Sequence, residues 1–222
     1  MNMLTDIEIP IVIVAFGNAD DVVRCLSALG KQRGCPKFGV FLCENAGRDA
    51  FNVLAGALSQ AGGPCSGAFE RAVVTSPDFL RVIETSLAGR AVPVFVAEAK
   101  ENFGFAGGVN TWIRLFLREQ GWTGVWILNP DTWPEPDALA ELVASAVGRH
   151  KGMVTSRIMI PGRDDVNSSR GLKWDKLRAK TIGVDIFAPV DPAPDPDDVE
   201  RRMDAPTGVS LYVSKECIDK IG

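Results

Sequence analysis

Four short, uninterrupted apolar runs constrain the fold of this chain more than any other feature. The first, residues 9–16, is rich in isoleucine and valine and contains no charged side chain. Strands of this kind are buried on both faces, which is typical of a parallel sheet covered by helices. Comparable runs occupy residues 38–43, 92–96 and 124–128. The 222 residues therefore predict one α/β domain with a mostly parallel central sheet flanked by helices.

Apolar residues at helical spacing fill most of the stretches between these runs. After a turn, Val22, Leu26 and Leu29 recur at helical intervals, and Asn18 or Asp20 can cap that helix. Further helices are expected at residues 51–60, 110–119 and 139–147, and from 215 onward. In such a βα alternation, functional side chains gather at the carboxyl ends of the strands.

Several segments interrupt the alternation. Residues 62–90 are interpreted as an insertion with a helix around 79–87, and Pro93 suggests that the next strand enters the sheet there or lies at its edge. Strands are expected within 154–160 and 207–213. We expect an irregular loop at 161–175 and, because proline and aspartate dominate 188–199, an exposed and mobile segment there.

Composition and charge exclude several classes of protein. A net charge of −4 offers no basic footprint, so no nucleic-acid partner is expected. The five cysteines form no CxxC pair and accompany one histidine, which argues against disulfides or a zinc site and suits a reducing cytoplasm. Nothing resembles a signal peptide or a run of ~18 apolar residues, so no membrane span is expected. Peripheral attachment to a membrane stays open.

A glycine-rich segment, residues 102–110, follows the third apolar run. Gly104, Gly107 and Gly108 remove side-chain obstruction, so backbone N–H groups and the start of the next helix can face a phosphate or a ribose. The alternative is that these glycines serve only the packing of a helix on a strand. The segment is not GxGxxG, so a dinucleotide-binding fingerprint fits poorly.

A carboxylate stands just after the fourth apolar run, in Asn129-Pro130-Asp131-Thr132. Pro130 biases Asn129 towards an extended conformation, which would present Asp131 at the rim of the sheet. There it can hold Mg²⁺ or Mn²⁺ while a diphosphate and water fill the other positions. The alternative is a turn or N-cap aspartate before the next helix.

Two further titratable residues carry less specific signals. Glu44 ends the second run and can accept a hydrogen bond from the imide N–H of a base, although by itself a solvated loop charge is the simpler interpretation. His150 lies near a helix end, where it is better explained as a partner of the helix dipole than as a catalytic base. No GxSxG, P-loop or HExxH motif is present.

Four segments in order resemble family 2 glycosyltransferases, in particular the bacterial rhamnosyltransferase-like subgroup. They are residues 11–18, 40–45, 102–110 and 128–132, and residues 208–222 resemble a later strand and helix of that family. The resemblance implies a GT-A fold with a Rossmann-like sheet over residues 1–222. Residues 1–132 would form the half that binds the nucleotide sugar, and residues 133–222 the acceptor side.

The same resemblance implies the chemistry. The donor would be a nucleoside-diphosphate sugar, either dTDP-rhamnose-like or a UDP-sugar, with a divalent cation (Mn²⁺ or Mg²⁺) and inversion at the anomeric carbon. The acceptor would be a glycan or lipid-linked molecule of polysaccharide assembly. The location would be cytoplasmic, with the inner face of the membrane left open.

Site residues carry over by position. The substrate-binding residues implied are Ala15, Phe16, Asn18, Glu44, Asn102, Gly104, Phe105, Gly107, Gly108, Asn110 and Asn129. Glu44 would bond the base, where aspartate is commoner. Asp131 would be the metal ligand, as the last residue of a DxD triplet whose first position holds Asn129.

The general base is not identified. In relatives it lies in an acidic segment after the helix that here reaches Gly222, so we expect it beyond that residue and expect this chain to bind donor but transfer sugar poorly. Asp185 and Asp204 are substitutes without a spacing argument. Two alternatives stay open, a nucleotide-sugar-binding module without catalysis and a nucleotidyltransferase, for which Gly17-Asn18-Ala19 is a weak match.

Overall fold

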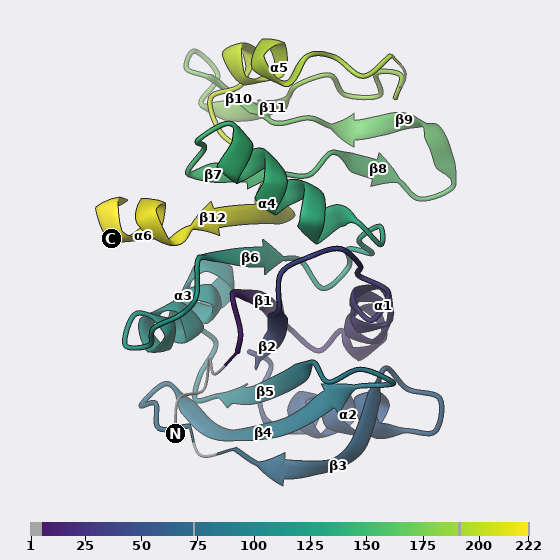
Figure 1. The fold of residues 1–222 in the computed structure, drawn as a ribbon, viewed down its shortest axis with the longest axis vertical. Helices are drawn as coiled ribbons and strands as arrows, with labels where there is room; N and C mark the ends of the chain where they lie inside the picture. The colour runs from purple at the N-terminus through teal and green to yellow at the C-terminus, as the bar shows by residue number, and fades with distance from the viewer. Residues whose placement is uncertain (1–5, 73, 191, 222) are drawn as a thin grey trace.

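The computed structural model describes residues 6–72, 74–190 and 192–221. Its main feature is a mixed eight-stranded sheet that runs through the molecule (Figure 1). In order across the sheet, the strands are β3 (Cys65–Arg71), β4 (Phe79–Leu87), β5 (Pro93–Ala99), β2 (Phe38–Glu44), β1 (Ile9–Ala15), β6 (Gly124–Leu128), β12 (Ser210–Ser214) and β7 (Met153–Thr155). The four central strands, β5, β2, β1 and β6, are parallel, and antiparallel strands extend the sheet on both sides. The predicted α/β class is therefore confirmed.

Helices cover both faces of the parallel strands. They are α1 (Ala19–Leu29), α2 (Arg48–Ser59), α3 (Gly104–Phe116), α4 (Ala138–Gly148) and α6 (Lys215–Ile221). A further helix, α5 (Pro196–Arg202), lies away from these strands. Alternate residues of β1 divide the core, because Ile11 packs in the cluster that contains the buried residues of α1, α2 and α4, and Val12 packs with α3 and α6. Figure 1 shows α1 and α3 on opposite sides of the sheet. Double coverage explains why β1 and β2 are entirely buried.

The helix expected at 79–87 is wrong, because this segment is strand β4. It pairs with β3 on one side and β5 on the other, so both rows of its backbone groups are satisfied. Pro93 begins β5 between β4 and β2, which confirms an entry position and excludes an edge. The supposed insertion is thus a hairpin that widens the sheet.

The irregular loop expected at 161–175 is also wrong. That region contains β9 (Arg163–Ser169), which pairs with β8 (Ile158–Ile160), and β10 (Leu172–Asp175), which pairs with β11 (Lys180–Gly183). The strand expected within 154–160 is divided between β7 and β8. In the segment 188–199, α5 begins at Pro196. Figure 1 shows these small sheets and α5 gathered at one end of the molecule, above α4.

The chain ends limit what can be compared with the sequence. Residues 1–5, where no signal peptide is expected, and Gly222, which would end the last predicted helix, lie outside the described residues. Among the residues that the structure does describe, no helix is both long and apolar enough to cross a bilayer.

Close strand packing makes Gly124 a sensitive position. A Cβ placed on this β6 residue would lie 2.7 Å from Cε2 of Tyr212 on β12. We expect Gly124→Ala to lower the free energy of unfolding by about 1–3 kcal/mol through overpacking, measured by urea denaturation. The matched control is Gly56→Ala in α2, where a Cβ meets nothing within 4 Å and up to about 1 kcal/mol of stabilisation is expected. Equal losses in both variants would contradict the close approach.

Candidate functional site

The carboxyl ends of β1, β2 and β6 meet at one edge of the sheet. Ala15 is in register with Glu44. β1 and β6 pair through Val12 and Ile127, so the end of β1 lies level with the turn that follows β6. Three of the sequence segments that carried the functional prediction are therefore neighbours, at the edge where open α/β sheets bind ligands.

Glu44 is a buried carboxylate whose two oxygens have different surroundings. It is 0% exposed. Its Oε1 accepts hydrogen bonds from the backbone N–H groups of Gly17 at 3.0 Å and Ala46 at 2.8 Å. Its Oε2 is also buried and has no hydrogen-bond partner within the described part of the chain. Glu44 is thus no solvated loop charge: it joins the turn after β1 to the turn after β2.

The turn after β1 presents an aromatic ring to solvent. Phe16 is 63% exposed, and Gly17 has a φ of 70°, a left-handed conformation that glycine adopts without strain. Asn18 precedes α1, but its side chain does not cap the helix; its Oδ1 instead accepts the N–H of Phe16 at 3.0 Å. Of the two expected capping residues, Asn18 thus occupies the N-cap position of α1, but it makes no side-chain capping hydrogen bond. Ala15 is buried, and its carbonyl accepts the N–H of Asn45 at 2.9 Å.

The glycine-rich segment is mostly helix. α3 begins at Gly104, six residues before the predicted start at Asn110, so the loop expected at 102–110 is largely the first turns of a helix. A Cβ on Gly108 would lie 2.9 Å from Cγ1 of Val14 and 3.1 Å from Nδ2 of Asn45. Gly108 therefore lets α3 approach the end of β1, and the helix-packing alternative applies to it. Local helix propensity of glycine is poor, and tertiary packing overrides it here.

The start of α3 remains open to the strand edge. Gly104 has a φ of 66°, and a Cβ there would meet nothing within 4 Å. Its N–H is bound by Oδ1 of Asn102 at 2.9 Å. Phe105 is 45% exposed and Asn110 lies on the exposed side of the helix, whereas Gly107 packs against Phe103. The segment thus contributes a helix N-terminus rather than a glycine loop.

Asn45 is a site residue that the sequence analysis missed. It is 5% exposed, its backbone joins β2 to β1, and its Nδ2 donates to the carbonyl of Gly104 at 2.9 Å. The backbone and the side chain of one residue therefore hold the ends of two strands against the start of α3. Its position directly after Glu44 at a strand end was the available signal.

A second buried carboxylate, also missed, lies beside the first. Glu98 at the end of β5 is in register with Glu44 and is 1% exposed. Its Oε2 accepts Nε of Arg81 at 2.6 Å, and Nε of Arg48 lies 3.5 Å from its Oε1. Two guanidinium groups thus compensate Glu98, whereas backbone N–H groups alone hold Glu44. A charged residue at the end of an apolar run was the signal in the sequence.

Asp131 is exposed in the turn after β6. The N–H of Thr132 donates to the carbonyl of Asn129 at 3.2 Å and closes that turn. Because α4 begins only at Ala138, Asp131 is not its N-cap. Within the described residues its carboxylate accepts no hydrogen bond, but it acts on Cys25, whose thiol pKa is raised mainly by burial and further by this charge. The carboxylate is therefore free to meet a ligand.

The oxygen atoms of this turn suit a hard cation. Carboxylate and amide oxygens are the donors that Mg²⁺ and Mn²⁺ prefer. No group of three or more His, Cys, Asp or Glu side chains with metal-binding geometry occurs in the described ranges. A cation here would thus rely on Asp131, on Asn129 and on oxygens of the substrate itself, as Mg²⁺ commonly does.

The two substitute bases are engaged elsewhere. Asp185 binds Nη1 of Arg202 at 2.5 Å and Nη2 at 2.8 Å, and this pairing holds the pKa of its carboxyl below the usual value. Asp204 accepts the backbone N–H of Trp174 at 2.7 Å. A carboxylate with a lowered pKa is a weak proton acceptor, so Asp185 is poorly suited to remove a proton from a hydroxyl. His150, which the sequence predicts near a helix end, lies just after α4 in a left-handed backbone conformation with a φ of 53°.

A cavity of about 310 Å³ lies away from this edge, among α4, β7 and α5. Its cations Arg149 and Lys151 form ion pairs with Asp197 and Glu200, which fasten α5 to the rest of the chain. The lining also contains Arg157 and Arg170, and the cavity is separate from the candidate site.

Similarity to known proteins is found among solved structures, and it is distant. No protein-family model and no curated protein sequence matches the chain. Among solved structures, the crystal structure of S. aureus TarS, a glycosyltransferase, aligns with a TM-score of 0.44 and 12% identity. The alignment covers 74% of this chain and 24% of TarS, so the chain spans about a quarter of that protein. At this level of similarity, function has to be argued from the residues of the chain itself.

The two hydrogen bonds that Glu44 accepts lead to a prediction about stability. Glu44→Ala leaves the N–H groups of Gly17 and Ala46 without their acceptor, so we expect a loss of about 1–3 kcal/mol in the free energy of unfolding. Glu44→Gln keeps an acceptor oxygen and should lose clearly less. Urea denaturation of both variants measures the difference. Equal losses would show that the hydrogen bonds do not explain the burial of this side chain.

Proposed function

We propose that the chain binds a nucleoside-diphosphate sugar at the edge formed by β1, β2 and β6, as the donor-binding part of a glycosyltransferase. The observation that carries the proposal is the unpartnered, buried Oε2 of Glu44, whose other oxygen binds the turn that carries the exposed ring of Phe16. Buried polar atoms without partners are rare, and their presence in a site calls for a ligand or a functional explanation.

The chemistry of Glu44 selects among bases. An ionised carboxylate only accepts hydrogen bonds. Uracil, thymine and guanine present a ring N–H to such an acceptor, whereas the corresponding ring nitrogen of adenine or cytosine is itself an acceptor. Phe16 offers an aromatic face on which a base can stack. Because Oε2 is covered by the protein, binding requires a small movement of the turn at Gly17, which glycine allows.

The start of α3 and the turn after β6 suit the diphosphate. Backbone N–H groups at a helix N-terminus favour an anion, and the first turn of α3 contains no acidic residue. The open space at Gly104 leaves room for a ligand close to the backbone. Asp131 and Asn129 would hold a divalent cation, which neutralises charge on a departing diphosphate.

A binding module without catalysis is the second candidate. Inverting transfer needs a carboxylate that removes the proton of the acceptor hydroxyl, and the engagement of Asp185 and Asp204 in other contacts favours this alternative. A nucleotidyltransferase is less favoured, because the N–H of Gly17 is bound by Glu44 and is not offered to a phosphate. The acceptor, a glycan or a lipid-linked molecule, belongs to the proposal without a residue assigned to it.

Calorimetry with UDP, dTDP, GDP and ADP, with and without Mn²⁺, tests the proposal. We expect binding of at least one of the first three nucleotides, strengthened by Mn²⁺, and no comparable binding of ADP. Asp131→Ala should abolish the effect of Mn²⁺ and weaken binding about tenfold or more, because interactions with charged groups contribute ~1.5–3 kcal/mol. The control is Asp137→Ala, an exposed aspartate without a capping hydrogen bond, which should bind as the parent does.

Glu44→Gln separates base recognition from metal binding. The substitution replaces one acceptor oxygen by a donor, so nucleotide affinity should fall about tenfold while the response to Mn²⁺ persists. Tight ADP binding, or nucleotide binding that neither variant alters, would refute the proposed site. A donor hydrolysis assay then distinguishes an enzyme from a binding module.

A further inference from the structure

The hairpin β10–β11 is a basic segment in an acidic chain. From Leu172 to Gly183 the sequence contains four cations and one acid, a segment charge of +3, although the whole chain carries −4. The rest of the chain therefore carries −7, the difference between these two values. The charged residues of the hairpin are Lys173, Asp175, Lys176, Arg178 and Lys180. Positive charge is thus concentrated on one small projection.

Most of this charge is uncompensated. Among the four cations, Arg178 pairs with Asp175 at 3.1 Å. Within the described part of the chain, Lys173, Lys176 and Lys180 form no ion pair, and all three are exposed. The hairpin can therefore attract an anionic surface without first breaking contacts inside the protein.

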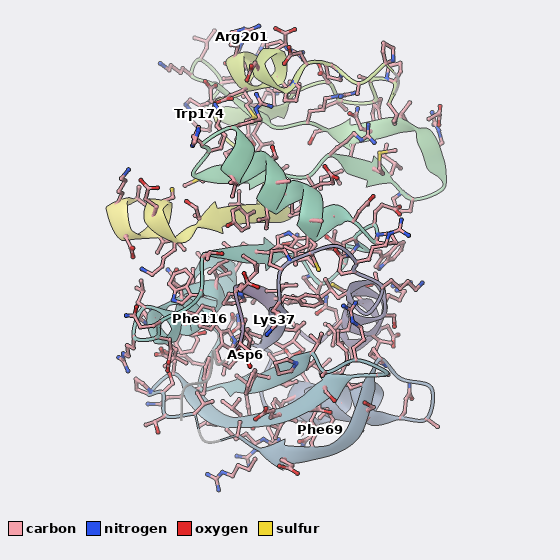
Figure 2. The ribbon with its side chains drawn as sticks, in the orientation of Figure 1. Asp6, Lys37, Phe69, Phe116, Trp174 and Arg201 are labelled. Carbon is pink, nitrogen blue, oxygen red and sulfur yellow. The ribbon has the colours of Figure 1, made fainter. Side chains whose placement is uncertain are left out.

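Large apolar side chains accompany the cations. Leu177, in the turn between the strands, is 93% exposed, and Trp174 and Ile182 are 46% and 40% exposed. In Figure 2, Trp174 lies at the same end of the molecule as Arg201 of α5, away from the central strands. A fully exposed leucine at the tip of a hairpin has no role in the core of this chain.

The hairpin is held in place at its base. The N–H of Leu172 donates to the carbonyl of Ala205 at 2.9 Å, and the N–H of Trp174 to Asp204. Within the turn, Oδ1 of Asp175 accepts the N–H groups of Leu177 and Arg178, both at 3.1 Å. Leu177 is therefore presented outward by a preorganised turn.

We propose that the β10–β11 hairpin docks this protein on an anionic lipid bilayer. Leu177 and Trp174 would enter the interfacial region, where tryptophan is favoured, and the lysines would meet the charged headgroups. This inference is independent of the proposed function, because none of its residues belongs to the strand edge.

The arrangement of the apolar side chains favours a bilayer over a folded protein partner. Trp174 is in register with Thr181, and Ile182 with Lys173, so Trp174 and Ile182 lie on opposite faces of the two-stranded ribbon. A rigid partner surface covers one face of a ribbon. A fluid interface surrounds both faces of a hairpin that enters tip first.

Cosedimentation with vesicles tests the docking. One set consists of phosphatidylcholine alone, and in the other about one third of the lipid is anionic phosphatidylglycerol. We expect binding to the anionic vesicles only, weakened by salt. Lys176→Gln with Lys180→Gln should weaken it at least about tenfold, because each cation near such a surface contributes roughly fivefold. The charge-matched control is Lys31→Gln with Lys37→Gln, which should bind as the parent does.

Insertion of the tip needs its own test. Leu177→Ser should weaken binding about tenfold, and Leu117→Ser, at a leucine that is 47% exposed beyond α3, should leave it unchanged. Thermal unfolding without vesicles verifies that each variant is folded.

Fluorescence quenching tests the insertion of Trp174 directly. With brominated lipid in the vesicles, Trp174→Phe should abolish quenching of the tryptophan fluorescence, whereas Trp133→Phe should keep it.

Three results of the cosedimentation would overturn the proposal. They are the absence of binding to anionic vesicles, equal binding to both vesicle types, and binding that Leu177→Ser does not change. Persistent quenching in Trp174→Phe would likewise exclude insertion through this hairpin, and capture of the chain by a protein partner through Leu177 without vesicle binding would assign the surface to that partner instead.

Discussion

The candidate site depends on one buried carboxylate. Glu44 enters the interior with two backbone N–H groups on a single oxygen, so the turns after β1 and β2 are fixed relative to each other. Burying a charge is costly unless hydrogen bonds compensate it. Because only half of the hydrogen-bonding capacity of Glu44 is used, the same interaction that organises the edge also leaves it an acceptor for a ligand.

The close approach of α3 is the second constraint. Gly108 lets the helix contact Val14, and Asn45 holds the carbonyl of Gly104. Together they bring a helix N-terminus beside the ends of β1 and β2. Asp131 follows β6, the strand that pairs with β1 on its other side. An edge with an acceptor, an aromatic ring, helix N–H groups and a free carboxylate therefore arises from packing contacts. In the proposed function the first two groups meet the base and the last two meet the diphosphate and its cation.

Much of the central fold is predictable because burial on both faces leaves a local signature. Strands β1, β2 and β6 and helices α1, α2 and α4 follow from continuous apolar runs and helical spacing. The hairpins β3–β4 and β10–β11 do not, because their strands are half-exposed and are stabilised by pairing with distant segments. The helix from Gly104 is missed for a related reason, since its glycines oppose helix locally.

By itself, the sequence determined that residues 9–16, 38–43 and 124–128 are buried strands and that Glu44, Asn129 and Asp131 stand at their carboxyl ends. Only the tertiary structure decided their state. Glu44 is buried, and one of its two carboxylate oxygens accepts hydrogen bonds. Asp131 is exposed, and its carboxylate accepts none from the described residues, although both residues follow an apolar run. The physical reason is that solvation and hydrogen-bond partners come from neighbouring turns and helices that are distant in the chain, and a local pattern contains no information about them.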